Sequence, residues 1–368
     1  MAKIFYSMAG EGRGHATRVR AVVEQLRRRH EIVLYAPGDA HQLLAPIYEG
    51  TEVVVRQVPC LRFCYTQKRL NPIATVRDGA RYLWRLPKLV QEIRRDIERE
   101  VPDLAVTDFE PALPRAAKAA GVPFLSLDHQ HFLSCCSLDA LPTSLRMHAW
   151  IWGRVVERYY SGQTETVISS FFNTPLRKLL AGPVSQIGVL LQPEILNVHP
   201  RAGNGLVVYL RKFASNALLS ALQSIGRPTK IYGLGEQPSR GSLQFHAIDQ
   251  RRFLEDLSES EALITTAGNQ VVGEALYLGK PVLGLPESNN YEQSINAFFL
   301  RQMATGDSAD WRRVGRGDLV RFLDRLDEFK ANIDRDALNG NAKAVAAIER
   351  LLPPVALKPS MPPKLVSA

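Results

Sequence analysis

Short β-branched and apolar runs alternate with helical patterns through both halves of this 368-residue chain. Such alternation is typical of parallel sheets covered by helices on both faces. In the first half the predicted strands are 3–8, 31–36, 52–58, 104–109, 123–128 and 166–172. In the second half they are 205–210, 229–234, 243–248, 262–266 and 281–285. Because the chain is too long for one ordinary core, we expect an α/β protein with two doubly wound domains.

The predicted domain boundary is a segment rich in proline, glycine and turn residues. We expect a first domain at 1–182, a linker at 183–204 and a second domain at 205–330. A C-terminal helix should follow at 331–352, and the proline-rich tail 353–368 should be disordered. The two domains would face each other across a cleft, walled by the carboxyl ends of both sheets, where open α/β sheets bind ligands.

Composition and charge exclude several classes of protein. Hydrophobic residues make up 45% of the chain and charged residues 23%, which is ordinary for a globular protein. No apolar run approaches the roughly 20 residues of a membrane span. The opening MAKIFYSMAG lacks the hydrophobic region of a signal peptide, so we expect a cytoplasmic protein. The net charge of +9 is spread over both halves, which favours an anionic small ligand or an anionic membrane surface over nucleic acid.

The four cysteines are Cys60, Cys64, Cys135 and Cys136. Their spacing contains no CxxC and is poor for structural zinc, although the two pairs could meet in space to hold a metal. Reduced and partly buried thiols are the favoured interpretation. We therefore expect no metal site.

The segment 263–297 contains a strand, a glycine and a helical pattern in direct succession. A helix that begins at Gly268 would offer unpaired backbone N–H groups and the positive pole of its dipole to a phosphate. Glu274, about one and a half turns further along, could accept hydrogen bonds from two ribose hydroxyls. Glu292 and Gln293 open a later helix and could bind a polyol. The alternative is that the glycine serves only the tight turn of an ordinary α/β unit.

Another glycine-rich loop follows the first predicted strand, where Gly10, Gly12 and Gly14 precede His15. The spacing is not the GxGxxG of a dinucleotide-binding site, and the next strand ends without an acidic residue, so we expect no nicotinamide cofactor. The glycines instead let a ligand approach the backbone and set His15 at the mouth of the sheet. Histidine exchanges protons near neutral pH, which suits a general base. The alternative is a histidine that caps the next helix or meets solvent.

A histidine base needs a partner that orients its other ring nitrogen. Asp108 is the first candidate, because parallel strands end at the same edge of a sheet. Asp128, His129 and His131 end the next strand and could serve instead. An Asp/His cluster also suggests metal, but in an extended segment the two histidines would point to opposite sides. We therefore favour a base or an acceptor contact over a metal site.

With these residues in place, the chain resembles the metal-independent, inverting nucleotide-sugar glycosyltransferases of the GT-B fold. Within them it is similar to the branch that holds the peptidoglycan lipid-intermediate GlcNAc transferase and UDP-glycosyltransferases. The resemblance rests on the first loop with Gly14-His15, the central linker and a donor motif. That motif consists of Gly268, Glu274-Ala275-Leu276, Gly279-x-Pro281, Pro286, Glu292-Gln293 and Asn296-Ala297. The resemblance implies two Rossmann-like domains that face each other across a cleft.

The resemblance also implies roles for single residues. His15, oriented by Asp108, would deprotonate the acceptor hydroxyl, which attacks the sugar while the nucleotide diphosphate leaves. Arg211 or Lys212 would help the helix pole to stabilise that diphosphate, so no cation or cofactor is expected. The implied donor-side positions are Gly268, Asn269, Gln270, Glu274, Glu292, Gln293, Ile248 and Arg211. The implied acceptor-side positions are Gly12, Gly14, Asp128 and His129.

Three positions depart from the pattern of many relatives. Thr266 stands where a histidine is usual, Val271 where a serine is usual, and Gln270 where asparagine is common. Two side-chain contacts to phosphate are therefore missing or altered. We expect either more reliance on backbone and basic residues or a different donor.

Two stretches, 76–100 and 145–160, mix basic and aromatic residues. They could dock on an anionic membrane and present a lipid-linked or cell-envelope acceptor at its inner face. The alternative is that they are ordinary amphipathic helices packed on a sheet. A UDP-sugar donor is favoured over other nucleotide-sugars. A nucleotide-sugar epimerase of the same fold and a non-catalytic nucleotide-sugar-binding protein remain rival functions.

Overall fold

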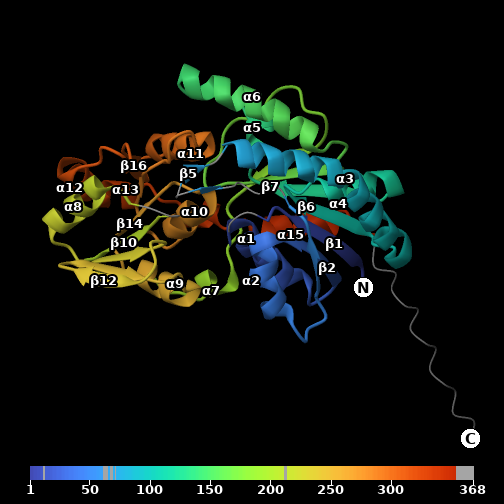
Figure 1. Ribbon diagram of the computed structural model, residues 1–368, viewed down its shortest axis with the longest axis horizontal. Coiled ribbons are helices and arrows are strands. Elements are labelled where there is room, and N and C mark those ends of the chain that lie inside the picture. Colours follow the sequence, from blue (N-terminus) through green and yellow to red (C-terminus); the bar gives the residue numbers. More distant parts are fainter. Residues whose placement is uncertain (11–12, 61–64, 67–68, 71, 211–213, 354–368) are drawn as a thin grey trace, which may run out of the picture.

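The computed structural model describes the chain except for residues 11–12, 61–64, 67–68, 71, 211–213 and 354–368 (Figure 1). Gly12, Cys64, Arg211 and Lys212, which the sequence singled out, lie outside the described residues, as does the tail from 354 onward. The two halves of the chain form two neighbouring lobes, each built on its own seven-stranded sheet. This is the predicted fold class, two doubly wound α/β domains.

The first sheet is entirely parallel and has the order β3-β2-β1-β6-β7-β8-β9. Its strands are β1 Lys3–Met8, β2 Glu31–Pro37, β3 Val54–Val58, β6 Leu104–Asp108, β7 Phe124–Asp128, β8 Glu165–Ser169 and β9 Val184–Ile187. A separate hairpin pairs β4 Tyr65–Thr66 with β5 Arg69–Leu70. The central strands form where the sequence predicts them because they are buried on both faces, which favours continuous apolar runs.

The second sheet has the order β12-β13-β11-β10-β14-β15-β16. Its strands are β10 Leu206–Tyr209, β11 Thr229–Tyr232, β12 Gln237–Arg240, β13 Leu243–His246, β14 Ala262–Thr265, β15 Val282–Gly284 and β16 Gly306–Ser308. Neighbouring strands are parallel except for β12, which runs antiparallel to β13 at the edge. The edge strands β9, β12 and β16 were not predicted. These three strands are only partly buried and carry no clear apolar pattern, unlike the fourth edge strand β3, which lies within the predicted strand 52–58.

Helices cover both faces of each sheet (Figure 1). In the first half they are α1 Arg13–Leu26, α2 Gly38–Tyr48, α3 Pro72–Glu100, α4 Ala112–Ala120, α5 Phe132–Cys135 and α6 Thr143–Tyr159. Later come α7 Pro193–Leu196, α8 Asn216–Ile225, α9 Gln250–Ser258, α10 Asn269–Tyr277, α11 Tyr291–Gln302, α12 Arg316–Leu323, α13 Leu326–Ala331, α14 Arg335–Leu338 and α15 Asn341–Arg350. Along β1 the side chains of Ile4 and Tyr6 enter one core and Phe5 enters the other, as the two-residue period of a strand requires. Within the described residues, none of the helices combines the length and the apolar character needed to cross a membrane.

The segments that join the halves differ from the expectation. The predicted linker 183–204 begins with β9, which pairs with β8, and continues through α7. The predicted single helix at 331–352 instead comprises the short α14 and, after a turn at Gly340, the helix α15. At this turn Gly340 donates its N–H to Val189 O at 3.0 Å, so the linker and the segment before α15 cross here. Beyond the crossing, α15 packs on α1 of the first half.

Candidate active site

His15 and Asp108 lie together at the carboxyl end of the first sheet. Asp108 is the last residue of β6 and stands opposite Met8, the last residue of β1. His15 lies in the first turn of α1, the helix that follows β1, and its Nδ1 is 2.9 Å from Asp108 Oδ2. The carboxylate is fully buried, while the His15 side chain is 17% exposed. The structure thus contains the pair that the strand-end argument predicted.

Arg18 is a third member of this cluster, and the sequence analysis missed it. Its Nε donates to Asp108 Oδ2 at 2.6 Å, and its Nη2 donates to Asp108 Oδ1. The same Nη2 lies 2.7 Å from His15 Nδ1. Burial on its own would raise the pKa of Asp108, but the charge of Arg18 and the hydrogen bonds from His15 and Arg18 hold that pKa below its ordinary value. The available signal was spacing, since residues three apart on a helix share a face.

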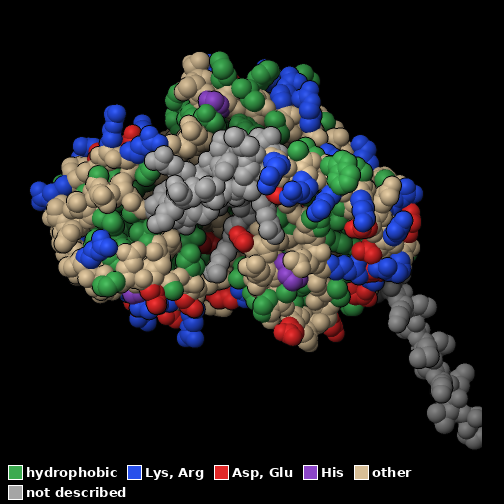
Figure 2. Space-filling view, in the orientation of Figure 1, with side chains coloured by type: hydrophobic (Ala, Val, Ile, Leu, Met, Phe, Trp, Pro, Cys, Tyr) green, Lys and Arg blue, Asp and Glu red, His purple; other side chains and the backbone are tan. Residues whose placement is uncertain are grey.

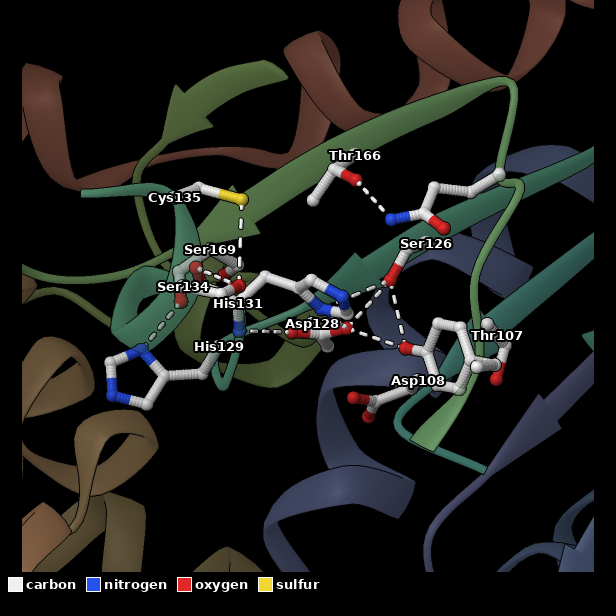
Figure 3. Close-up of polar contacts among 12 residues, drawn as sticks. Thr107, Asp108, Ser126, Asp128, His129, His131, Ser134, Cys135, Thr166 and Ser169 are labelled. Carbon is white, nitrogen blue, oxygen red and sulfur yellow. Dashed lines mark hydrogen bonds and ion pairs between the residues drawn. The ribbon is translucent and has the colours of Figure 1, made fainter. Parts of the chain in front are cut away.

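Asp128 belongs to a different hydrogen-bond network from His15. Its carboxylate accepts hydrogen bonds from Ser126 Oγ at 2.7 Å and from the Tyr160 hydroxyl at 2.9 Å, and its Oδ2 is 2.7 Å from His131 Nδ1 (Figure 3). Burial would raise the pKa of Asp128, but His131 and these hydrogen bonds hold it low. Asp128 and His131 are both buried. Asp128 therefore does not orient His15, because its carboxylate contacts Ser126, His131 and Tyr160 instead.

The prediction of an extended segment after β7 is wrong. The chain turns there because Asp128 Oδ1 accepts the backbone N–H of His131 at 2.9 Å, a side-chain contact that stabilises a turn. His129 is fully buried between the halves. Its Nδ1 lies 3.2 Å from Ser169 O, and its Nε2 lies 3.3 Å from Asn296 Oδ1. Burial lowers the pKa of His129. The structure thus places this predicted acceptor contact at the junction of the two lobes.

The loop before α10 also meets the first half. Gly268 is the N-cap of α10, and Ala267 before it adopts a left-handed backbone with φ of 63°. The Asn269 amide donates to Ser169 O at 3.2 Å, and its Oδ1 accepts the Phe171 N–H at 3.2 Å. The first turn of α10 is thus fixed by residues at and just after the end of strand β8. No sequence pattern within the second half could have shown this contact.

Gln270 and Glu274 lie one turn apart on α10. The Gln270 amide donates to Leu190 O and to Glu274 Oε1, both at 2.8 Å. Its carbonyl oxygen is buried and has no hydrogen-bond partner among the described residues. Burial raises the pKa of Glu274 to about 7, and the bond from Gln270 opposes that rise. A methyl group at Gly14 would lie 3.9 Å from Gln270 Cβ, so the first turn of α1, which carries His15, faces this helix.

Glu292 and Gln293 lie in the first turn of α11, as predicted. Asn290 caps that helix by accepting the Gln293 N–H at 3.2 Å, and Gln293 Oε1 accepts the Glu287 N–H at 2.8 Å. Burial lowers the pKa of Arg18, but the charge and hydrogen bonds of Asp108 outweigh this and raise it. The charge of Glu292 adds to the rise. Glu292 therefore lies close enough to the His15 cluster to act on it. Ile248 is 41% exposed in the loop after β13.

The remaining predictions concern metal ligands and thiols. Cys135 and Cys136 are buried, and burial raises the pKa of both thiols. Asp334 and Asp336, which form an Asp-x-Asp sequence, lie at the start of α14, where Asp334 accepts the Ala337 N–H at 3.2 Å. Among the residues that the structure describes, no three or more His, Cys, Asp or Glu side chains are grouped to hold a metal ion.

Comparison with known proteins agrees with this architecture. The family model described as Glycosyl transferase family 1 matches residues 2–327. Among solved structures, MurG of Acinetobacter baumannii is 15% identical with a TM-score of 0.62, covering 95% of this chain and 100% of its own. A UDP-glucosyltransferase from Polygonum tinctorium is 14% identical with a TM-score of 0.66, covering 95% and 98%. The glycosyltransferase SnogD from Streptomyces nogalater is 17% identical with a TM-score of 0.61, covering 95% and 99%.

No curated protein sequence matches the chain. The solved structures share its fold over nearly their whole length, and the family model covers most of the sequence, including both halves of the candidate site. The chain therefore belongs to glycosyl transferase family 1, and the protein is a glycosyltransferase with the GT-B fold.

Proposed function

We propose that the protein transfers a sugar from a nucleotide-sugar, with a UDP-sugar favoured, to an acceptor hydroxyl by a metal-independent, inverting reaction. The observation that carries this proposal is the placement of the His15–Asp108 pair beside α10 of the other half. A base with a buried carboxylate behind it then faces the amino end of a helix. These are the two groups that such a transfer needs, one to take a proton and one to hold the departing diphosphate.

In the proposed reaction, the N–H at His15 Nδ1 donates a hydrogen bond to the Asp108 carboxylate, which stays ionised, and Nε2 accepts the acceptor's hydroxyl proton. The acceptor oxygen attacks the anomeric carbon from the face opposite the diphosphate, so the configuration at that carbon inverts. The bond to the diphosphate breaks, and its charge develops beside the backbone N–H groups of Gly268 and Asn269. Fixed N–H dipoles that point at a developing charge stabilise the transition state without a cation.

The rest of the donor would occupy the carboxyl end of the second sheet. In this proposal Glu274 accepts the two ribose hydroxyls, and Glu292 and Gln293 bind hydroxyls of the transferred sugar. The free carbonyl oxygen of Gln270 accepts a further donor hydroxyl or N–H group. The backbone near Ile248 meets the base. Because Thr266 and Val271 offer less to phosphate than the residues usual there, backbone contacts carry more of the diphosphate.

A first experiment tests the donor. Thermal shifts with UDP-, GDP-, dTDP- and CMP-sugars should show stabilisation by one class, because a ligand that binds only the folded state raises its stability. His15→Gln should keep that shift and lose about 100-fold or more in turnover. Glu274→Ala should lose the shift. Unchanged turnover in both variants contradicts the site, and clean epimerisation of the sugar without acceptor would establish the rival epimerase. A shift without turnover on any acceptor indicates the binding protein.

For the acceptor, we propose a lipid-linked or cell-envelope glycan reached at the inner face of an anionic membrane. The support is the outer surface of α6, where Met147, Trp150 and Ile151 are 62%, 58% and 45% exposed beside Arg146 and Arg154. Figure 2 shows hydrophobic and basic side chains together over this helix, at the top of the view. Exposed aromatic and basic side chains in one face suit the headgroup region of an anionic bilayer.

The same helix touches the donor half. His148 of α6 stacks on Tyr291 of α11 with ring centroids 3.5 Å apart, next to Glu292. A membrane bound to α6 would therefore lie beside the proposed sugar site. Sedimentation with vesicles of phosphatidylglycerol and phosphatidylcholine should capture the protein, and vesicles of phosphatidylcholine alone should not. Trp150→Ser should weaken capture, while Val101→Ser, at an apolar site elsewhere that is 74% exposed against 58% for Trp150, should not. Equal capture by both vesicle types contradicts this acceptor surface.

A further inference from the structure

Arg18 is the one member of the His15 cluster that the proposed reaction leaves without a task. It is a buried cation that contacts both oxygens of Asp108 and approaches the ring nitrogen that Asp108 orients. We propose that Arg18 is a positioning residue, which holds the Asp108 side chain as an oriented carboxylate and thereby keeps the His15 proton on Nδ1. The proposal rests on His15 acting as the base of the transfer.

The first step concerns charge. The Asp108 side chain is 0% accessible, and the Arg18 side chain is only 5% accessible. Asp108 therefore bears the full energetic cost of a buried charge. A carboxylate in such a place takes up a proton unless a cation compensates it. His15 cannot supply that charge in its resting state, because a base must be neutral to accept a proton. Arg18 can, since a guanidinium stays charged at every physiological pH.

The second step concerns orientation. Arg18 uses two N–H groups of one planar fork, with Nε on Oδ2 and Nη2 on Oδ1. Rotation of the carboxylate about its own axis would break both bonds, so the fork fixes the plane in which Oδ2 meets His15. A lysine ammonium would compensate the charge as a point but would not fix this plane. The helix α1 carries both Arg18 and His15, so it sets both groups against Asp108 of β6.

The third step concerns the proton on His15. A neutral imidazole has one N–H, and His15 Nδ1 lies 2.9 Å from Asp108 Oδ2 and 2.7 Å from Arg18 Nη2. With the hydrogen on Nδ1, the ring donates to the carboxylate and Nε2 has a free lone pair. With the hydrogen on Nε2, Nδ1 accepts from Arg18 and Nε2 can take no proton from the acceptor. In the first arrangement Asp108 Oδ2 accepts from His15 Nδ1 as well as from Arg18 Nε, whereas in the second it loses the ring N–H, so the ionised carboxylate favours the active tautomer.

Loss of Arg18 would reverse this selection. The buried Asp108 would then take up a proton, and its O–H would donate to Nδ1. The ring hydrogen would move to Nε2, and the base would be lost although every group that touches substrate remained. Arg18 thus affects the reaction only through Asp108 and His15.

Kinetics of Arg18→Ala, Arg18→Lys and the control Arg27→Ala test the proposal. Arg27 lies immediately after the end of the same helix, exposed and paired with Glu24 of that helix. Arg18→Ala should lower kcat about 100-fold or more, with the donor KM within about threefold of the parent. Arg18→Lys should recover only part of the loss, Arg27→Ala should behave as the parent, and guanidinium ion added below denaturing concentration should raise the kcat of Arg18→Ala. A kcat within threefold of the parent, a loss confined to KM, or no rescue overturns the proposal.

A measurement on the unaltered protein keeps the test decisive if Arg18→Ala does not fold. Nitrogen-15 NMR of the full chain labelled at histidine, assigned with His15→Gln, should show the His15 hydrogen on Nδ1. A hydrogen on Nε2 in the unaltered protein overturns the proposal by itself. In the pair variant Arg18→Met with Asp108→Asn, which buries no charge, the hydrogen should no longer be held on Nδ1, and retention there also overturns it.

The outcomes separate this proposal from the function on which it rests. If His15→Gln keeps full turnover, the proposed transfer mechanism is wrong and Arg18 has no base to position. If His15→Gln is inactive while Arg18→Ala keeps both its turnover and the Nδ1 hydrogen, only the role of Arg18 is wrong.

Discussion

At the scale of single residues, Glu274 combines burial with a task that needs charge. Its side chain lies in α10 with one hydrogen bond from Gln270, and burial raises its pKa to about 7. Below about pH 7 this raised pKa favours the protonated carboxyl group. A ribose that donates two hydrogen bonds would favour the ionised form. The same carboxyl group thus couples both folding and donor binding to pH.

We predict that Glu274→Gln stabilises the protein at pH 8 but not near pH 4. The folded-state pKa is raised, so between about 4.5 and 7 the folded chain holds a proton that the unfolded chain releases, and stability falls as pH rises. Above pH 7 the loss is complete and amounts to about 3 kcal/mol, at about 1.4 kcal/mol for each pKa unit. Melting curves at both pH values measure it, with the exposed Glu49→Gln as control. Equal effects at both pH values contradict the prediction.

Donor affinity should show the opposite trend. Because ribose hydroxyls donate to the ionised carboxylate, binding must first remove the proton below pH 7. We expect the dissociation constant of the donor to rise roughly tenfold for each pH unit below 7. Calorimetric titration between pH 5.5 and 8 measures this trend. A dissociation constant that is flat across that range would show that Glu274 does not hold the ribose.

At the scale of elements, the two connecting segments depend on their close crossing. The Asn341 amide donates to Leu191 O at 2.6 Å and accepts the Leu191 N–H at 2.8 Å. A Cβ atom on Gly188 would lie 2.5 Å from the carbonyl oxygens of Ala337 and Leu338. Only a glycine lets the backbones approach so closely. The crossing thus fixes how the linker enters the second half.

We predict that Gly188→Ala destabilises the protein by about 1–3 kcal/mol, because backbone atoms must move to admit the methyl group. Gly182→Ala is the matched control in the same stretch of chain. A Cβ atom there meets only Gln163 O, at 4.0 Å. Urea unfolding of both variants measures the difference. If the two substitutions cost the same, the crossing is not as tight as the contacts indicate.

The elements also show why part of the molecule was predictable. Central strands such as β6 and β7 are buried on both faces, so their apolar runs identified them, and the shared edge of parallel strands then brought Asp108 to His15. Arg18 was missed because many arginines follow a histidine at helical spacing without a buried partner. The turn after β7 was missed because a side-chain hydrogen bond from Asp128 overrides the extended pattern. The Asn269 contacts join segments 100 residues apart and leave no local pattern.

At the scale of the whole molecule, α15 joins the end of the chain to the first lobe. Ala344, Val345 and Ile348 lie in the same core as Val19 and Val22 of α1. At the end of α15, Arg350 forms an ion pair with Glu165 of β8, with N–O distances of 2.6 and 2.8 Å. The second lobe is therefore joined to the first lobe on both sides in the sequence, by the linker before it and by α15 after it.

We predict that Ile348→Ala lowers the stability of the entire protein by about 2–4 kcal/mol, because it opens a cavity in a fully buried position. Lys343→Ala, on the exposed side of the same helix, should change little. Scanning calorimetry should show the shift in the transition that includes the first lobe. An unchanged transition for Ile348→Ala would mean that α15 contributes nothing to that core.

The return of α15 has a consequence for synthesis on the ribosome. The first lobe emerges with the apolar face of α1 incomplete, because the residues that cover it, Ala344 to Ile348, are translated after the entire second lobe. The amino-terminal half must therefore wait, partly uncovered, for more than 150 further residues. A chain that stops early would keep that surface exposed, and quality-control factors that recognise apolar surface could distinguish it from a finished one.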